Sequence, residues 1–188
     1  SSAVSQYGLI TVHRVKEKGY FEISDSILNR SMMAVTRYSK TAAGGGIYGG
    51  EEVKRQMLHW EKGPANKLFI RSNTIVVNSP DSSKPIFQSV LNSNSDPIIA
   101  SFDIKAIKTS ANNKSYVIDV TDYFNGDEQS FGLGSVRKQL LKLKSIQKES
   151  SFINRISAYP INIEIRTTKT YDIVPLSISS SPSPSPGN

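Results

Sequence analysis

The sequence predicts an α+β domain rich in β-structure, with one or more largely antiparallel sheets built from hairpins and a few short helices. Segments in which apolar and polar residues alternate recur along the chain, as expected of half-buried strands. Turn-forming residues separate these segments at short intervals, which is typical of hairpins. The alternation is good at 97–108, where Phe102 and Ile104 share one face, and it is clearest at 161–166. Strands joined by short turns pair in antiparallel fashion, so sheets of that kind are expected.

The individual strands are expected wherever β-branched or aromatic residues lie between such turns. In chain order they span residues 9–15, 20–24, 32–38, 53–60, 67–77, 97–108, 115–121 and 161–166. A change of phase near Ser72 and Asn73 predicts a β-bulge in the fifth of these strands.

Helices are expected in four places. Short helical turns are predicted at 27–29, after an N-capping serine, and at 122–126, before a closing glycine. Residues 85–92 carry apolar side chains at helical spacing. The fourth helix is predicted by a buried apolar stripe, formed by Val136, Leu140, Leu143 and Ile146.

The chain is expected to form one domain at residues 7–176. Residues 1–6 are expected to be a disordered or linker-like start, without the basic and apolar regions of a signal peptide. Residues 177–188 end in SSSPSPSPGN, a Ser/Pro-rich linker or loop that has no apolar side chain to add to a core. A linker in that position leads us to expect that a further segment follows it.

Composition narrows the classes of function. The 188 residues include no cysteine, which excludes disulfides, thiolate metal sites and a cysteine nucleophile. No apolar run approaches the 18 residues of a membrane span, so none is expected. The formal net charge of +7 favours an anionic partner only where the basic residues cluster.

A dinucleotide-binding fingerprint, GxGxxG, occurs at Gly44, Gly46 and Gly49. Its chemistry requires a tight turn from a strand into a helix whose N-terminus meets the pyrophosphate. Here Glu51 and Glu52 would face the phosphate, and no repeated βαβ pattern follows. A loop is therefore the preferred interpretation, and no cofactor is expected in this segment.

Other catalytic patterns are incomplete. A catalytic zinc ion takes three protein ligands, but the only histidines, His13 and His59, are far apart in the sequence, and HExxH is absent. No metal site is therefore expected. Nothing supports a Ser-His-Asp triad. An acid pair would need two carboxylates facing each other, and the candidates are Asp96, Asp103, Asp119, Asp122 and Asp127.

A basic segment at 135–155 is the one marked charge asymmetry, with six positive residues against Glu149. If the segment is helical, its lysines lie around the buried stripe, where they form either a solvated face or a candidate surface for anionic lipid or an acidic protein partner. It lacks the interleaved aromatics of a single-strand binder, so nucleic acid is not expected as a partner. The candidate docking residues are Arg137, Lys138, Lys142, Lys144, Lys148 and Trp60.

Five segments carry a resemblance to a known family. They read ISDSILNRSMMAVTRYSKTAAGG, YGGEEVKRQMLHWEKGPANKLFIRS, NSNSDPIIASFDIKAI, VIDVTDYFNGDEQSFGL and SFINRISAYPINIEIRTTKTY. In order and spacing they resemble an uncharacterised N-terminal domain that precedes the catalytic domain in a family of bacterial HExxH zinc-dependent metalloproteases. The resemblance runs from residue 7 to residue 171.

The resemblance implies a protein that is periplasmic, outer-membrane-associated or secreted, with zinc held by a catalytic domain downstream. The helix that carries the zinc ligands is absent from this sequence, so it implies no catalytic residue here. It implies instead a non-catalytic accessory domain, which packs on or regulates the catalytic domain of the same polypeptide and so lies close to its peptide or protein substrate.

Two other hypotheses stay open on the sequence. One is a stand-alone binding module of the cell envelope, for glycan, peptide or protein, that uses exposed aromatics at Tyr48, Trp60, Tyr123 and Phe124. The other is an enzyme in its own right, which requires a concave site with converging titratable groups.

Overall fold

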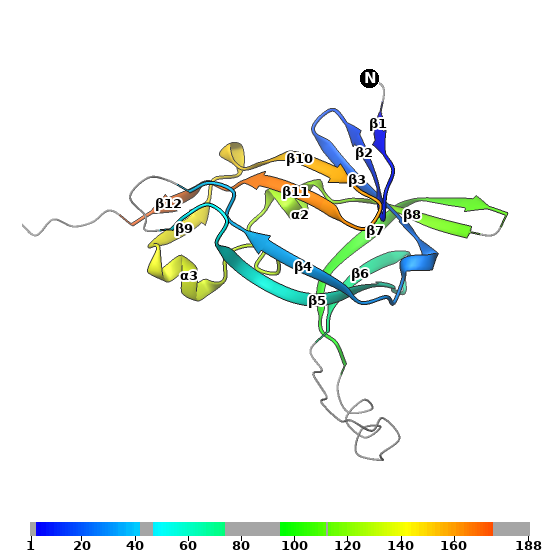
Figure 1. The fold of residues 1–188 in the computed structure, drawn as a ribbon, viewed down its shortest axis with the longest axis horizontal. Coiled ribbons are helices and arrows are strands. Elements are labelled where there is room, and N and C mark those ends of the chain that lie inside the picture. Colours follow the sequence, from blue (N-terminus) through cyan, green and yellow to red (C-terminus); the bar gives the residue numbers. More distant parts are fainter. Residues whose placement is uncertain (1–2, 42–46, 74–94, 112, 175–188) are drawn as a thin grey trace, which may run out of the picture.

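A computed structural model describes residues 3–41, 47–73, 95–111 and 113–174. These residues form one eight-stranded sheet, in which every pair of neighbours is antiparallel, and two separate two-stranded sheets (Figure 1). The strands are β1 (Val4–Gln6), β2 (Thr11–Val15), β3 (Lys18–Ser24), β4 (Met32–Arg37), β5 (Glu52–Lys62), β6 (Lys67–Ser72), β7 (Ile98–Ser110), β8 (Asn113–Asp119), β9 (Leu143–Ile146), β10 (Phe152–Ala158), β11 (Ile163–Thr168) and β12 (Tyr171–Ile173).

The described helices are short. They are the 3₁₀ turns η1 (Asp25–Ile27) and η2 (Lys148–Ser150) and the α-helices α2 (Thr121–Asn125) and α3 (Ser135–Leu140). The predicted fold class, a β-rich and largely antiparallel α+β domain, is therefore confirmed. No helix among the described residues is long and apolar enough to cross a membrane.

The large sheet has the strand order β1-β2-β3-β8-β7-β6-β5-β4. Most neighbours are joined by hairpins, but β3 pairs with β8 across almost a hundred residues, with Phe21 opposite Ile118. The sheet therefore has β1 at one edge and β4 at the other. Figure 1 shows α3, β9 and β12 at one end of the molecule and the tip of the β7–β8 hairpin at the other.

The core lies on one face of the large sheet. Alternation along β3 buries Phe21 and Ile23, and the same period along β7 buries Phe102 and Ile104. The β10–β11 hairpin adds Ile156, which is 1% exposed, and α2 contacts both β3 and β10. Because these elements close over the sheet, the chain buries one continuous cluster of apolar side chains.

Aromatic rings from α2 join the parts of this core. The ring of Phe124 lies 6.1 Å from that of Phe21 in β3, and the ring of Tyr123 lies 5.2 Å from that of Phe102 in β7. Phe131 contacts both helical rings, at 6.1 and 5.9 Å. Tilted and edge-on pairs of this kind stabilise beyond their buried area, so α2 fastens the loop after it to the sheet.

The structure differs from the predicted elements at both ends of the chain. Residues 4–6, expected within a linker, form β1 and pair with β2. Strands β10 and β12 were not predicted, and the strand expected at 161–166 starts at Ile163. The ladder shifts between Ile70 and Arg71, earlier than the predicted bulge, and β6 ends at Ser72.

Several predictions fall on residues outside those described. They are the glycine-rich run at 42–46, the end of the strand at 67–77, the helix at 85–92 and the Ser/Pro-rich linker or loop at 177–188.

Candidate docking surface

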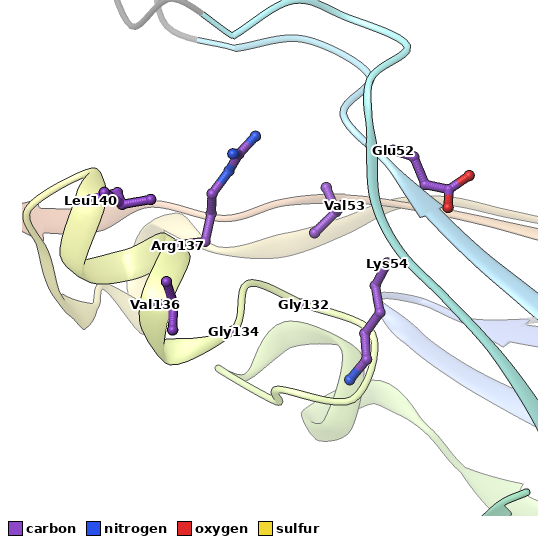
Figure 2. A pocket seen from close by; sticks show the side chains of 8 residues that line it. All are labelled: Glu52, Val53, Lys54, Gly132, Gly134, Val136, Arg137 and Leu140. Carbon is purple, nitrogen blue, oxygen red and sulfur yellow. The ribbon is translucent and has the colours of Figure 1, made fainter. Parts of the chain in front are cut away.

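An open hollow lies between the start of β5 and helix α3, with a volume of about 440 Å³ (Figure 2). Val53, Val136 and Leu140 supply its apolar lining. Lys54 and Arg137 add positive charge at its border, and Glu52 adds one negative charge. Two glycines, Gly132 and Gly134, form the loop that leads into α3 and lines the floor in Figure 2.

The shape of the hollow depends on how soon α3 ends. Lys142 has a φ of 54°, in the left-handed region, which stops the helix after Leu140. The chain then turns into β9, where Ile146 pairs with Tyr171 of β12. The predicted stripe over 136–146 is therefore wrong as a single buried helical face, because its second half forms a strand.

The early end of α3 leaves its own apolar side chains uncovered. Val136 is 69% exposed and Leu140 is 71% exposed, whereas Leu143 and Ile146 of β9 are half-buried. Two large apolar side chains therefore lie in solvent beside a concave surface, which makes the hollow a candidate contact site for another protein.

The positive groups of the hollow are held in place. Arg137 Nε donates to the Tyr38 hydroxyl at 3.2 Å, and the guanidinium carbon lies 5.7 Å from the centre of the same ring. Its Nη2 is 3.8 Å from Glu51 Oε2. Lys54 Nζ donates to the Gln129 carbonyl at 3.2 Å. A partner that offers an apolar side chain flanked by carboxylates would match this arrangement.

The structure separates the predicted basic residues into two groups. Lys138 is half-buried against Asp127, with Nζ 2.6 Å from Oδ1, and its Nζ lies 5.7 Å from the centre of the Tyr171 ring. Its charge is thus already compensated within the chain. Lys142, Lys144 and Lys148 are exposed, and with Arg137 they remain candidates for docking.

Trp60 was wrongly predicted to lie on the surface. It is 4% exposed, because it points from β5 to the core face, where its ring lies 6.0 Å from that of Phe102. Among the other aromatics proposed for a binding module, Phe124 is buried and Tyr123 is half-buried, so both belong to the core. Only Tyr48, 74% exposed, lies on the surface as predicted.

A compact charged cluster, which no sequence pattern indicates, lies beside α3. Lys169 donates to the carbonyls of Phe124, at 2.6 Å, and Gly126, and burial lowers the pKa of its ammonium group. Burial raises the pKa of Glu128, which accepts from the Phe131 amide at 2.7 Å. The Lys169 bonds join the end of α2 to the segment between β11 and β12, and the Glu128 bond lies within the loop that follows α2.

His13 belongs to a polar row on the face of the sheet opposite the core. Ser5 Oγ lies 2.7 Å from His13 Nδ1, and His13 Nε2 lies 3.0 Å from Glu22 Oε2. Glu22 Oε1 also accepts from Ser115 Oγ at 2.6 Å and lies 3.3 Å from Lys108 Nζ. Partial burial works to raise the pKa of Glu22, but the bonds from these neighbours outweigh it and lower that pKa.

This row contains a serine, a histidine and a carboxylate, yet its geometry is that of a cross-strand ladder. Its five members come from five consecutive strands, β1, β2, β3, β8 and β7, and none of them lines the hollow. Nucleophilic catalysis needs donors for an oxyanion and a concave site for substrate. We therefore assign the row to holding the strands in register.

His59 lies in a second polar group, on the exposed face of β5. Its Nδ1 is 2.7 Å from Asn73 Oδ1, while its nitrogens are 4.0 Å from Glu61 and 3.9 Å from Asp96. Arg71 Nε lies 2.6 Å from Glu61 Oε2, and its positive charge opposes the binding of a cation there. In the described part of the chain, no group of three or more acidic or histidine side chains is arranged to hold a metal ion.

The structure also tests the other predicted motifs. Gly44 and Gly46 lie outside the described residues, but the segment after Gly49 forms strand β5, so the helix that a dinucleotide fingerprint requires is not there. The carboxylates have separate partners: Asp103 pairs with Lys67 at 2.7 Å, and Asp119 accepts from the Thr121 amide at 3.0 Å.

Fold and site together define a β-rich domain with an open hollow that is lined by apolar and basic side chains. The chain belongs to the family described as domain of unknown function (DUF5117), whose model matches residues 50–187. A second family, domain of unknown function (DUF5118), matches residues 1–41. No curated protein and no solved structure matched the chain in the comparisons.

The two matched segments share the eight-stranded sheet. Strands β1 to β4 come from the first segment, and the other strands come from the second. The first segment pairs at two places, through β3 with β8 and through β4 with β5. Its side chains Phe21 and Ile23 lie in the same core as Trp60. The two families thus describe parts of a single folded body.

Proposed function

We propose that this chain is a non-catalytic accessory domain of a zinc-dependent metalloprotease and that it docks on the catalytic domain of the same polypeptide. The segment order that resembles the N-terminal domain of such enzymes supports the proposal. The observation that carries it is the hollow, which the exposed side chains of Val136 and Leu140 line together with Lys54 and Arg137. Burial of these two side chains against the enzyme would remove apolar surface from water.

The matching surface of the catalytic domain would present one bulky apolar side chain beside carboxylates. Lys142 and Lys144, exposed in the turn after α3, would extend the contact to further acidic groups. Such a contact can hold the catalytic domain in a folded or closed state near its peptide or protein substrate. Zinc would bind to the catalytic domain, in a protein of the periplasm, the outer membrane surface or the exterior.

The test measures binding of the separately expressed catalytic domain to this chain by calorimetry. Leu140→Asp should weaken binding at least tenfold and leave the unfolding temperature of the chain unchanged. Ile161→Asp is the matched control, because Ile161 is 86% exposed and does not line the hollow. Equal loss in both variants, or no binding by the unmodified chain, would contradict the proposal.

A stand-alone envelope binding module is the second candidate, and the exposure of Tyr48 favours it. The ring is 74% exposed and lies between strands β4 and β5, where it could stack on a sugar. Screening of a glycan array with the chain and with Tyr48→Ala tests it. Binding that is lost in the variant supports this candidate, and the absence of any bound glycan removes it.

A further inference from the structure

Strand β4 is the last strand of the large sheet at one edge (Figure 1). Among the described strands it pairs only with β5. Its sequence, MMAVTR, has no proline and only one charged residue. Proteins usually protect a long apolar edge with charges, proline, a bulge or a covering segment, because the unpaired backbone groups recruit other strands. The β10–β11 hairpin forms a sheet of its own and has no backbone ladder with β4.

Hydrogen bonds in β5 show which residues of β4 face outward. The Trp60 carbonyl accepts from Asn29, which precedes β4, whereas the Met57 carbonyl accepts from Asn73, which follows β6. The backbone groups of successive residues in a strand point to opposite neighbours. Gln56, four residues before Trp60, therefore points toward β4 as Trp60 does, and it bonds with Ala34, its register partner there. The backbone groups of Met33 and Val35 therefore point away from the sheet.

These same two residues carry exposed side chains. Met33 is 61% exposed and Val35 is 37% exposed, and Met57, the register partner of Met33, is 43% exposed. A strand added beside β4 would thus form backbone hydrogen bonds. On one face it would also contact the apolar strip that Met33, Val35 and Met57 form. Recognition by strand addition uses this combination.

The charges near the end of β4 favour an acidic occupant. Arg37 and Arg55 share one carboxylate, Glu52, at 3.4 and 2.7 Å. Both arginine side chains remain more than half exposed, at 53% and 54%. A second copy of the chain would bring another Arg37 and a net charge of +7 to this edge, which opposes self-pairing.

We infer that β4 binds, as an added strand, an extended segment of another protein that is apolar in its middle and acidic at the end beside Arg37. Main-chain bonds to Met33 and Val35 would supply the pairing. The apolar strip would select alternate apolar side chains, and the free capacity of Arg37 and Arg55 would select carboxylates.

The experiment uses the full chain and a synthetic acetylated peptide of alternating valine and threonine that ends in three aspartates. Fluorescence anisotropy of the labelled peptide should show saturable binding. The peptide with N-methyl groups at alternate positions, and the peptide that ends in three lysines, should each bind at least tenfold more weakly. Equal binding of the three peptides, or no binding of the first, would overturn the inference.

Variants locate the site on β4. Val35→Pro removes an outward N–H without removing a bond to β5 and should abolish binding, while Val35→Thr, which keeps the N–H, should bind normally. Arg37→Gln should weaken the binding of the peptide that ends in aspartates and should not weaken the binding of the peptide that ends in lysines. If Val35→Pro fails to fold by circular dichroism, the N-methylated peptide alone decides. Sedimentation that shows a dimer lost in Val35→Pro would overturn the assignment to another protein. None of these measurements involves a catalytic domain, so they stand apart from the docking proposal.

Discussion

Gly19 of β3 lies against the side chain of Ile156 in β10, so closely that a Cβ atom on Gly19 would be 2.8 Å from Ile156 Cδ1. Because the side chain of glycine is a single hydrogen atom, the β10–β11 hairpin can pack closely on the large sheet at this position. The Gly19 amide donates to Thr121 Oγ1 at 3.0 Å, and the Gly19 carbonyl accepts from the Val120 amide at 3.0 Å. One small residue therefore joins β3, the start of α2 and β10.

Gly19→Ala should overpack this contact and lower the free energy of unfolding by about 1–3 kcal/mol. Ile156→Val, which removes the crowded Cδ1, should cost about 0.5–1.5 kcal/mol alone. Because the valine relieves the clash, the double variant should lose less stability than the sum of the two losses. Urea unfolding of the four proteins measures this coupling. Strictly additive losses would show that the two residues are not in contact.

Trp60→Ala should destabilise the chain by about 3–5 kcal/mol, because it leaves a cavity in the core next to Phe102. Tyr48→Ala also replaces an aromatic residue with alanine, but Tyr48 is exposed, so stability should change by no more than about 0.5 kcal/mol. Thermal unfolding followed by circular dichroism compares the two. Similar small effects would mean that Trp60 is on the surface after all.

Glu22→Gln should reduce stability at neutral pH by about 1.5 kcal/mol, since it weakens charge-assisted bonds from Ser115 and Lys108. The folded protein lowers the pKa of Glu22 below its ordinary value of 4.5. Its ionised form therefore contributes stability that is complete above pH 4.5 and is lost as the pH falls through the lower folded pKa.

The free energy of unfolding of the Glu22→Gln variant should accordingly fall less than that of the unmodified chain between neutral and acidic pH. Urea titrations at a series of pH values measure the difference. Glu17→Gln, in the exposed turn between β2 and β3, serves as the control and should follow the unmodified chain. Parallel profiles for all three proteins would refute the role of Glu22.

Lys142→Gly should raise stability by up to about 1 kcal/mol, because glycine adopts the φ of 54° without steric cost. Lys144→Gly, two residues on and inside β9, should lower stability, since glycine weakens a strand interior. A shift of the thermal midpoint in opposite directions is the expected outcome. A lower midpoint for both variants would show that the backbone at Lys142 is not strained.

Phe21→Ala should lower the free energy of unfolding of the whole chain by about 3–5 kcal/mol, and so lower its unfolding midpoint. Trp60, the single tryptophan, reports from the segment matched by the other family. If one sheet holds both segments, tryptophan fluorescence and circular dichroism should move together in this variant. Tyr7→Ala, 77% exposed, should leave both signals unchanged. Separate transitions would divide the chain into two units.

The sequence predicted strands well where one face of a hairpin is buried. The alternation over 97–108 corresponds to β7, because its apolar face packs on the core and its polar face meets water. It predicted poorly where contacts with distant residues decide the structure. The apolar spacing over 136–146 fits a helix, but pairing of Ile146 with Tyr171 makes the second half a strand.

The residues of the candidate docking surface could be predicted only in part, for a similar reason. Arg137 and the exposed lysines follow from the charge run at 135–155, which is visible without a structure. Spacing alone assigns Leu140 to a buried face, and nothing in the sequence places Lys138 against Asp127. Trp60 shows the converse, because an aromatic residue beside polar neighbours in β5 still points to the core.

The pairing of Phe21 with Ile118 also bears on how the chain folds. During synthesis, β3 has no neighbour on one side until residue 119 is made, so its contacts depend on closing a loop of almost a hundred residues. Folds dominated by such distant contacts form slowly. The first segment, rich in β-forming residues, is then exposed to wrong pairing for much of that time, and it would benefit from any factor that keeps extended chains apart until the sheet closes.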